Sequence, residues 1–271
     1  MSTSTSKGTA LITGASSGIG AIYAERLARR GYDLVLVARS QDKLVLLADT
    51  LSVKTGRKVE ALVADLAQPD GLRRVEQRLQ DDASITLLLN NAGLGATRSL
   101  VDSTPEELDD MVALNVTALT RLTRAVAPGM VARGGGTLIN ISSIVAVAPE
   151  VLNGTYGGTK AYVLALTQSL HHELAAKGVR VQAVLPGAIR TLFWDRAGVP
   201  VDNLPQTIVM EPADLVDAAL AGLDQGELVT LPSLPELADW TRFEEARQVL
   251  KPNLSHVKPA ARYGVGARVG A

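Results

Sequence analysis

The sequence predicts a single-domain α/β fold, a doubly wound parallel sheet of about seven strands with helices on both faces. Two observations carry this prediction. From residue 8 to about 190, short apolar runs alternate with longer segments whose apolar residues recur at helical spacing. The short runs are nearly continuous in Val, Ile and Leu, which is typical of strands buried on both faces.

The expected elements alternate along the chain. The expected strands are Thr9–Thr13, Asp33–Ala38, Val59–Ala64, Ile85–Leu89, Thr137–Ile141, Arg180–Leu185 and Glu227–Leu231. The expected helices are Ile19–Arg30, Gln41–Lys54, Pro69–Leu79, Pro105–Arg133, Thr155–Lys177, Pro212–Leu223 and about Pro235–Leu250. We expect residues 1–271 to form one domain, because no linker is long or polar enough to divide it. Residues 188–210 are expected to be irregular and 251–271 to be a tail.

Bulk composition excludes several function classes. The chain has 271 residues, 46% hydrophobic and 20% charged, and a formal net charge of −1. That charge gives no electrostatic case for binding nucleic acid or an acidic membrane. The absence of cysteine excludes disulfides, thiolate metal sites and a cysteine nucleophile, and no metal cluster is expected. No apolar run reaches the roughly 20 residues of a membrane span, so we expect a soluble, cytoplasmic protein.

A glycine-rich loop follows the first expected strand. It reads Gly14-x-x-x-Gly18-x-Gly20, which differs from the commoner G-x-G-x-x-G spacing. Glycines let the backbone turn sharply and approach a pyrophosphate, and the following helix offers its N-terminal N–H groups. Ser16 and Ser17 can add hydroxyl contacts. The alternative is a simple strand-to-helix turn.

The end of the second strand bears on the choice of cofactor. A carboxylate about 20 residues past the glycines usually accepts hydrogen bonds from an adenosine ribose. This sequence has Arg39 there, nineteen positions after Gly20, and Asp33 comes too early. A guanidinium suits a 2′-phosphate, so we predict NADP(H) rather than NAD(H). The alternative is a solvated arginine at a strand end.

Two further loops fit a dinucleotide. Asp65, at the end of the third strand, can accept a hydrogen bond from an adenine amino group, with Leu66 against the ring. Asn90-Asn91-Ala92-Gly93 follows the fourth strand, where small residues let a cofactor lie close and the Asn amides can join neighbouring strand ends. The alternative is a purely structural turn.

Tyr156 and Lys160 are four residues apart in an expected helix and therefore share one face. A free tyrosine has a pKa near 10, and a nearby ammonium favours its phenolate. Tyr156 can then give a proton to a carbonyl or take one from an alcohol. Ser143, thirteen positions earlier at the end of the fifth strand, can hydrogen-bond the reacting oxygen. Ser142 is its rival.

Asn115 lies within an expected helix, where asparagine is mildly disfavoured. Two readings stay open for it. It can hold a water that links Lys160 to solvent as a proton relay, or it can satisfy a backbone carbonyl.

Together these motifs make the chain, from about residue 7 to 231, similar to the short-chain dehydrogenase/reductase family, whose fold is of the Rossmann type. The matching pieces are Thr13–Gly20, Asp65, Asn90–Gly93, Asn115, Ser143, Tyr156, Lys160 and Pro186-Gly187-Ala188-Ile189-Arg190-Thr191. The resemblance implies a catalytic tetrad of Asn115, Ser143, Tyr156 and Lys160. It also implies that Ile189 and Thr191 hold the nicotinamide carboxamide, and that the protein is a homodimer or homotetramer.

The motifs and the resemblance together give the residues expected to contact the cofactor. They are Gly14, Ser16, Ser17, Gly18, Ile19, Gly20, Arg39, Asp65, Leu66, Asn91, Ala92, Gly93, Tyr156, Lys160, Pro186, Gly187, Ile189 and Thr191. Some NADP-preferring relatives carry a basic residue at the position of Ser17. The preference for NADP(H) therefore depends on Arg39 alone.

The substrate is expected to lie under residues 188–250. Phe193 and Trp194 can line an apolar pocket with Val145, Val147 and Leu94, next to Ser143 and Tyr156. Such a pocket suits a lipophilic ketone, aldehyde or alcohol; core packing is the alternative for the two aromatic residues. Arg121 and Arg124 can instead meet an acidic acyl carrier, as in a 3-oxoacyl-carrier-protein reductase, or form a solvated helix face. A catalytically silent cofactor-binding regulator and an isomerase or dehydratase remain alternatives from other classes.

Overall fold

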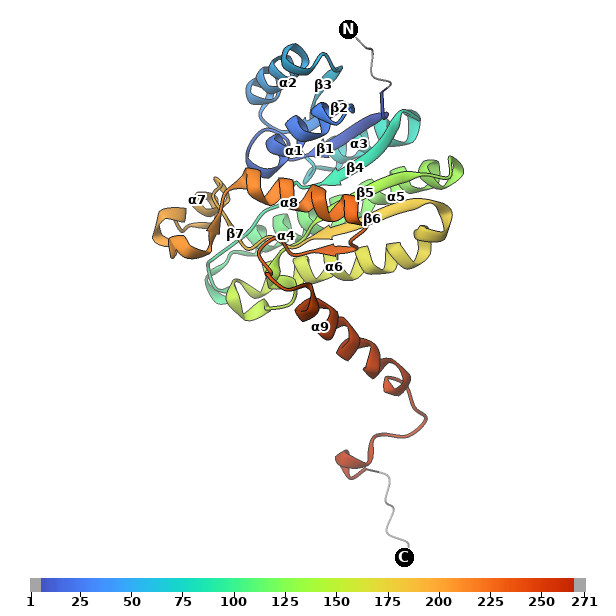
Figure 1. Ribbon diagram of the computed structural model, residues 1–271. Coiled ribbons are helices and arrows are strands. Elements are labelled where there is room, and N and C mark those ends of the chain that lie inside the picture. Colours follow the sequence, from blue (N-terminus) through green and yellow to red (C-terminus); the bar gives the residue numbers. More distant parts are fainter. Residues whose placement is uncertain (1–5, 266–271) are drawn as a thin grey trace, which may run out of the picture. The chain divides into compact units, whose positions relative to one another are not determined.

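The computed structural model describes residues 6–265, in two compact units that meet between Pro232 and Ser233. The first unit holds the sheet and its helices (Figure 1). Its seven strands are β1 (Thr9–Thr13), β2 (Asp33–Ala38), β3 (Val59–Val63), β4 (Ile85–Asn90), β5 (Gly136–Ile141), β6 (Val179–Val184) and β9 (Val229–Thr230). They pair in the order β3-β2-β1-β4-β5-β6-β9, and every pair is parallel.

This strand order confirms the predicted doubly wound sheet. The order reverses between β1 and β4, because the chain builds outward from β1 to β3 and then returns to the other side of β1. In such sheets, ligands bind beyond the carboxyl ends of the strands at the reversal. The glycine loop follows β1 and the Asn90–Gly93 segment begins at the end of β4, so these two segments meet at the reversal.

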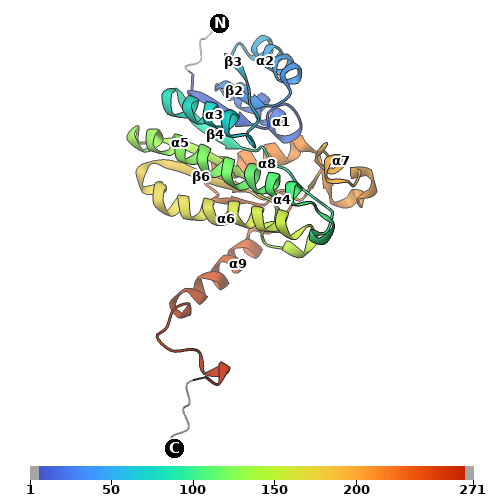
Figure 2. The ribbon, with the colours of Figure 1, turned by 180° about the vertical axis from the view of Figure 1, so that it is seen from behind.

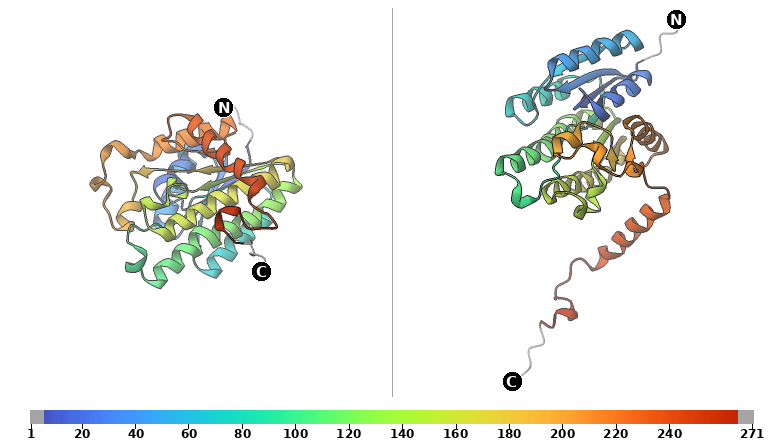
Figure 3. Two further views of the ribbon diagram at one scale, coloured as in Figure 1. Left: turned by 90° about the horizontal axis from the view of Figure 1, so that it is seen from below. Right: turned by 90° about the vertical axis from the view of Figure 1, so that its left-hand side faces the viewer.

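Helices cover both faces of the sheet, as Figures 1 and 2 show from opposite sides. One layer holds α1 (Gly18–Arg29), α2 (Gln41–Thr55) and α8 (Pro212–Gln225). The other holds α3 (Pro69–Asp81), α5 (Leu119–Ala132) and α6 (Gly154–Leu174). The further views of Figure 3 show the strands between the two helical layers.

Local sequence explains several helix boundaries. Helices α3 and α8 begin at prolines, whose missing N–H costs nothing in a first turn. The short helix α4 (Pro105–Val112) begins with a capping box between Thr104 and Glu107. Helix α2 ends at Gly56, which has a left-handed backbone with φ of 68°.

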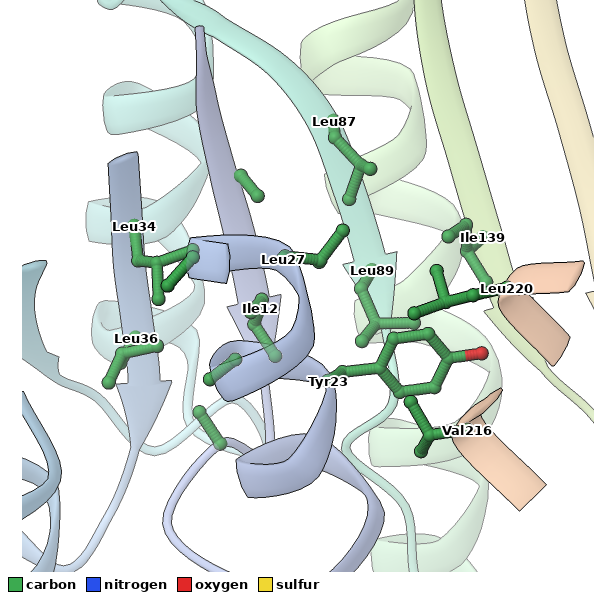
Figure 4. Packing of buried hydrophobic residues seen from close by; sticks show 14 of the residues in the cluster. Ile12, Tyr23, Leu27, Leu34, Leu36, Leu87, Leu89, Ile139, Val216 and Leu220 are labelled. Carbon is green, nitrogen blue, oxygen red and sulfur yellow. The ribbon is translucent and has the colours of Figure 1, made fainter. Parts of the chain in front are cut away.

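The core lies on both faces of the sheet. In the layer of α1 and α8, Tyr23 and Leu27 pack with Leu89, Ile139 and Leu220 (Figure 4). On the other face, residues of α3, α5 and α6 pack against alternate side chains of the same strands. The sheet is thus held from both sides, which fixes the strand ends that carry the site.

Three predicted elements differ from the observed ones. The expected helix 105–133 is divided into α4 and α5 by a π-helical turn, Ala113–Ala118, that contains Asn115. The last strand is shorter than predicted. Residues 188–210, expected to be irregular, contain the two-stranded parallel sheet β7 (Ala188–Ile189) and β8 (Val209–Met210) and the short helix α7 (Phe193–Ala197). Only short stretches order here, because no long apolar run is present.

The second unit, from Ser233, contains one α-helix, α9 (Leu237–Leu250), in its described part. None of the residues of α9 is buried, and Trp240 stacks on Phe243 with ring centroids 5.2 Å apart.

Short 3-10 turns occur in both units of the described chain. They are Leu100–Asp102, Ile144–Ala146, Pro149–Val151, Ala175–Lys177, Val201–Asn203, Gln206–Ile208, Lys251–Asn253 and Ala261–Tyr263. No described helix is long and apolar enough to cross a membrane.

Candidate active site

The glycine loop after β1 is shaped to receive a nucleotide. Gly14 and Gly18 have positive φ angles of 65° and 56°, a region that favours glycine. A Cβ on Gly20 would lie 2.4 Å from the carbonyl oxygen of Gly14, so the first turn of α1 packs directly on the loop. Ser17 is the N-cap of α1, and its hydroxyl makes no capping hydrogen bond. Free N–H groups and an unused hydroxyl at a helix start fit a pyrophosphate.

Asn91 holds the glycine loop against the end of β4. Its amide nitrogen donates to the carbonyl oxygens of Thr13 and Gly14 at 2.9 and 3.2 Å. The Thr13 hydroxyl accepts hydrogen bonds from the backbone N–H groups of Asn91 and Ala92. The expectation that asparagine amides join neighbouring strand ends is therefore confirmed. A Cβ on Gly14 would lie 2.8 Å from the Asn91 amide nitrogen, which explains the glycine there.

Arg39 stands one residue beyond β2, next to the glycine loop. The carbonyl oxygen of Val37 accepts a hydrogen bond from the N–H of Ala15, so β2 ends beside this loop. Arg39 is exposed, and no described residue pairs with its guanidinium. Asp33 lies at the other end of the strand, where it pairs with Arg57 at 3.0 Å. A free cation thus stands where a ribose-binding carboxylate would otherwise be.

Asp65 and Leu66, which follow β3, offer a nucleotide different groups. One carboxylate oxygen of Asp65 accepts a hydrogen bond from the N–H of Ala67 at 3.0 Å, which leaves the other for a ligand. The side chain of Leu66 is 5% exposed and packs in the core with Leu72. Leu66 can therefore offer a nucleotide its backbone groups, and the expected contact of its side chain with adenine stays a prediction.

The Pro186–Thr191 segment after β6 lies against the glycine loop. A Cβ on Gly18 would meet the Thr191 methyl group at 3.3 Å. The carbonyl oxygen of Pro186 accepts a hydrogen bond from the N–H of Ile144 at 3.0 Å, which joins this segment to the Ser143 loop. These contacts bring the glycine loop, the Pro186–Thr191 segment and the Ser143 loop to one edge of the sheet.

Tyr156 and Lys160 lie on one face of α6, as predicted, and both are buried. The Lys160 ammonium lies 5.7 Å from the centre of the Tyr156 ring and donates to the carbonyl oxygen of Ile141 at 2.9 Å. A Cβ on Gly93 would lie 3.6 Å from the Lys160 nitrogen, so the loop after β4 passes directly over the ammonium. The predicted cofactor and catalytic residues therefore adjoin.

Burial controls the protonation of this pair. It raises the pKa of Tyr156 to about 12, and the nearby Ser143 hydroxyl acts in the opposite direction. Burial also lowers the pKa of Lys160 to about 8. The expected lowering of the Tyr156 pKa by the ammonium is not seen, because the loss of hydration on burial raises this pKa instead. Tyr156 is consequently a neutral phenol, able to donate a proton.

Ser143 and Ser142 have different partners. The Ser143 hydroxyl donates to the carbonyl oxygen of Pro186 at 3.4 Å and stands close enough to the Tyr156 phenol to lower its pKa. The Ser142 hydroxyl donates to the carbonyl oxygen of Lys160 at 2.7 Å and so holds α6 in place. The geometry brings Ser143, and not its rival, to the phenol.

The side chain of Asn115 is engaged by protein groups. Its oxygen accepts from the N–H of Leu94 at 2.8 Å, and its nitrogen donates to the Leu94 carbonyl at 2.8 Å and to Thr159 at 3.0 Å. Of the two roles left open for Asn115, these contacts agree with the one in which it satisfies backbone groups. Asn115 fixes the loop after β4 against α6, and a role in a proton relay stays a prediction.

The predicted substrate residues separate into two groups. Val145 and Tyr156 form a buried apolar cluster with Met111, against which Leu94, Ala96, Ile144, Leu152 and Phe193 pack. The Phe193 ring lies 5.7 Å from the Tyr156 ring, tilted by 45°. Trp194 packs edge-on against Phe193 and donates its indole N–H to the Ile189 carbonyl at 3.0 Å. Contact between Trp194 and a substrate stays a prediction.

Sequence reasoning missed Asn153, which places Tyr156. Its side-chain oxygen accepts hydrogen bonds from the N–H groups of Thr155 and Tyr156, at 2.8 and 3.1 Å. Its amide nitrogen donates to the carbonyl of Arg98 at 2.6 Å. An asparagine just before a helix is a recognisable N-cap signal. The link to Arg98, fifty-five residues away, is not readable from spacing.

Comparisons with known proteins agree with this geometry. The model of the short chain dehydrogenase family matches residues 8–198. Very-long-chain 3-oxoacyl-CoA reductases of Phaeosphaeria nodorum and Bos taurus are 35% and 36% identical over 79% and 69% of this chain. The alignments cover 62% and 63% of those relatives, so the chain spans a little over three fifths of their length.

Two solved structures are similar over nearly the whole chain. A short-chain dehydrogenase from Sphingobium yanoikuyae in complex with NADPH is 52% identical, with a TM-score of 0.91, and the match covers 93% of this chain and 98% of that one. The bulky-bulky ketone specific alcohol dehydrogenase from Comamonas testosteroni is 46% identical, with a TM-score of 0.88, over 96% of this chain and 99% of that one. The protein therefore belongs to the short-chain dehydrogenase family.

Proposed function

We propose that the protein is an NADP(H)-dependent oxidoreductase that interconverts a ketone and a secondary alcohol. The observation that carries this proposal is the placement of the Tyr156 phenol, next to Ser143 and with the buried ammonium of Lys160 at 5.7 Å from its ring centre. This group stands at the edge of a glycine cradle fit for a dinucleotide. Membership of the short-chain dehydrogenase family supports the same reaction.

The residues present divide the chemistry of ketone reduction. Bound NADPH would supply the hydride that the carbonyl carbon needs. Tyr156 gives its proton to the carbonyl oxygen, so the ketone gains one hydride and one proton and becomes the alcohol. Ser143 donates a hydrogen bond to the same oxygen while negative charge develops on it. Lys160, as a cation, stabilises the phenolate that remains until Tyr156 regains a proton from solvent.

The cofactor would be held by three segments, the glycine loop (Gly14 and Ser16–Gly20), Asn91–Gly93 and Pro186–Thr191. Arg39 would hold its 2′-phosphate. Arg39 supports NADP(H) because its guanidinium is exposed beside the cradle and pairs with no carboxylate among residues 6–265. The NADPH complex of the Sphingobium yanoikuyae relative gives independent support.

The substrate is proposed to be a lipophilic ketone with bulky groups on the carbonyl. One side of Tyr156 packs in an apolar cluster with Val145 and Met111, which suits such groups. The Comamonas testosteroni relative, a bulky-bulky ketone specific alcohol dehydrogenase, supports the same class.

A 3-oxoacyl thioester is the second candidate substrate. The names of the curated reductases favour it, since those proteins are 3-oxoacyl-CoA reductases. The predicted docking arginine Arg121, however, pairs with Glu76 at 2.5 Å. Turnover of acyl-carrier thioesters but not of free ketones would contradict the proposal of a small ketone substrate.

Assembly and location are part of the proposal. A homodimer or homotetramer is supported by family membership, and light scattering on the purified protein tests it. A cytoplasmic location agrees with a chain free of cysteine.

The test of the proposed reaction is oxidation of NADPH in the presence of ketones, compared between the unmodified protein and Tyr156→Phe. The proposal requires turnover by the former and a loss of turnover, with NADPH binding retained, in the latter.

A further inference from the structure

The ring of Phe193 occupies a recess that only a glycine can provide. A Cβ on Gly95 would lie 2.0 Å from Cζ and 2.2 Å from Cε2 of Phe193, far inside van der Waals contact. Gly95 is not among the glycines with positive φ, so its backbone conformation is open to other residues. The need for glycine at this position therefore comes from the Phe193 ring.

The structure limits where Phe193 can move. Helix α7, which carries it, is tied to the loop of Gly95 because Thr97 donates to the carbonyl oxygen of Ala197 from both its N–H and its hydroxyl. The neighbouring Trp194 is 9% exposed, hydrogen-bonded to Ile189, and edge-on to Phe193 with centroids 5.5 Å apart. Gly95 and Trp194 flank the Phe193 ring, and Tyr156 lies 5.7 Å from it, so we expect a ring displaced from Gly95 to shift toward Tyr156.

We propose that Gly95 is a specificity-determining residue, because it lets Phe193 stand back from Tyr156 and so leaves width for ketones with large groups on both sides of the carbonyl. The inference deepens the proposed function and rests on it. The recess and the catalytic phenol are separate features: Gly95 touches Phe193, and Phe193 in turn lies 5.7 Å from the Tyr156 ring. The three atoms nearest to a methyl group at residue 95 all belong to Phe193, so the substitution acts first on that ring and not on Tyr156, Ser143 or Lys160.

The test compares two ketones in Gly95→Ala. Valerophenone has a phenyl and a butyl group on the carbonyl, and 2-butanone has only small ones. The kcat/KM for valerophenone is expected to fall about tenfold or more, since one methyl group in a closed pocket discriminates on this scale. The kcat/KM for 2-butanone is expected to stay within about twofold, because the general acid is unmoved.

Two further variants separate the recess from a general effect. In Phe193→Ala, adding Gly95→Ala is expected to change the valerophenone to 2-butanone ratio by less than about twofold, because the ring that the methyl group would displace is gone. Gly135→Ala is the matched control, since nothing lies within 4 Å of its added Cβ and its φ is not positive.

The outcomes are distinct. An unchanged ratio of kcat/KM for valerophenone to that for 2-butanone in folded Gly95→Ala overturns the inference but not the proposed function. The same holds if Gly95→Ala changes this ratio equally in the presence and in the absence of the Phe193 ring. If Gly95→Ala does not fold, Phe193→Leu provides the test, and it must shift the ratio toward valerophenone. Failure of the unmodified protein to reduce either ketone with NADPH contradicts the proposed function and the inference with it.

Discussion

At the scale of residues, burial decides how the Tyr156–Lys160 pair works. A phenol with a pKa of about 12 is protonated at neutral pH and suits proton donation to a ketone. An ammonium with a pKa of about 8 is still charged at pH 7. The pair is thus suited to reduction, with the proton on Tyr156 and the positive charge beside it.

Lys160 should titrate near pH 8 in the folded protein. NMR of ¹³C-labelled lysine side chains should show one Cε resonance with this midpoint, absent from Lys160→Met. Between pH 8 and 10 the unfolded chain holds a proton on this lysine that the folded chain has lost, so the free energy of unfolding should rise with pH. Above pH 10 it should stop rising, because the unfolded chain then loses the Tyr156 proton that the folded chain retains. A lysine midpoint above 10 for Lys160 would contradict this account.

Arg39 should decide between NADPH and NADH. In Arg39→Asp, the carboxylate repels the 2′-phosphate and can accept hydrogen bonds from a ribose, so the preference should move toward NADH by about 100-fold or more. The ratio of kcat/KM for the two cofactors measures it. Lys43→Asp makes a charge change of the same size in α2 and is the matched control. An unchanged ratio in Arg39→Asp refutes the assignment.

At the scale of elements, the start of α6 positions the general acid. Asn153 caps this helix and also binds the Arg98 carbonyl, so one side chain joins Tyr156 to the loop above the site. The π-helical turn positions Asn115, whose side chain joins Leu94 to Thr159. The start of α6 and the π-helical turn therefore each connect segments that lie far apart in the sequence.

Asn153→Ala should lower the free energy of unfolding by about 1–2 kcal/mol, as for other lost N-caps. It should also lower kcat, because Tyr156 loses its fixed place, while NADPH affinity stays unchanged. Asn153→Asp keeps the capping oxygen but sets a carboxylate oxygen against the Arg98 carbonyl, so it should recover only part of the stability and activity. Chemical denaturation and steady-state kinetics give the two readouts. Loss of stability with an unaltered kcat would show that the cap has no part in positioning Tyr156.

At the scale of the whole molecule, the sequence predicts the sheet closely and the contacts poorly. The strands β1 and β2 begin and end where the apolar runs predict, because strands buried on both faces carry a continuous signal. Short elements such as α7 and β7 were missed, since they depend on contacts with distant segments. The positions of Tyr156, Lys160 and Ser143 follow from helical spacing and strand ends. The recess at Gly95 does not, because it depends on Phe193, which is nearly a hundred residues away.

The central claim is that Tyr156 gives the proton in a reaction that consumes NADPH. The most direct measurement follows NADPH absorbance with valerophenone for the unmodified protein and for Tyr156→Phe, with NADPH binding measured by fluorescence in both. The account predicts formation of one alcohol per NADPH consumed, and a fall in kcat of about 10²- to 10⁴-fold in the variant at equal NADPH affinity. Turnover in Tyr156→Phe equal to that of the unmodified protein would contradict it.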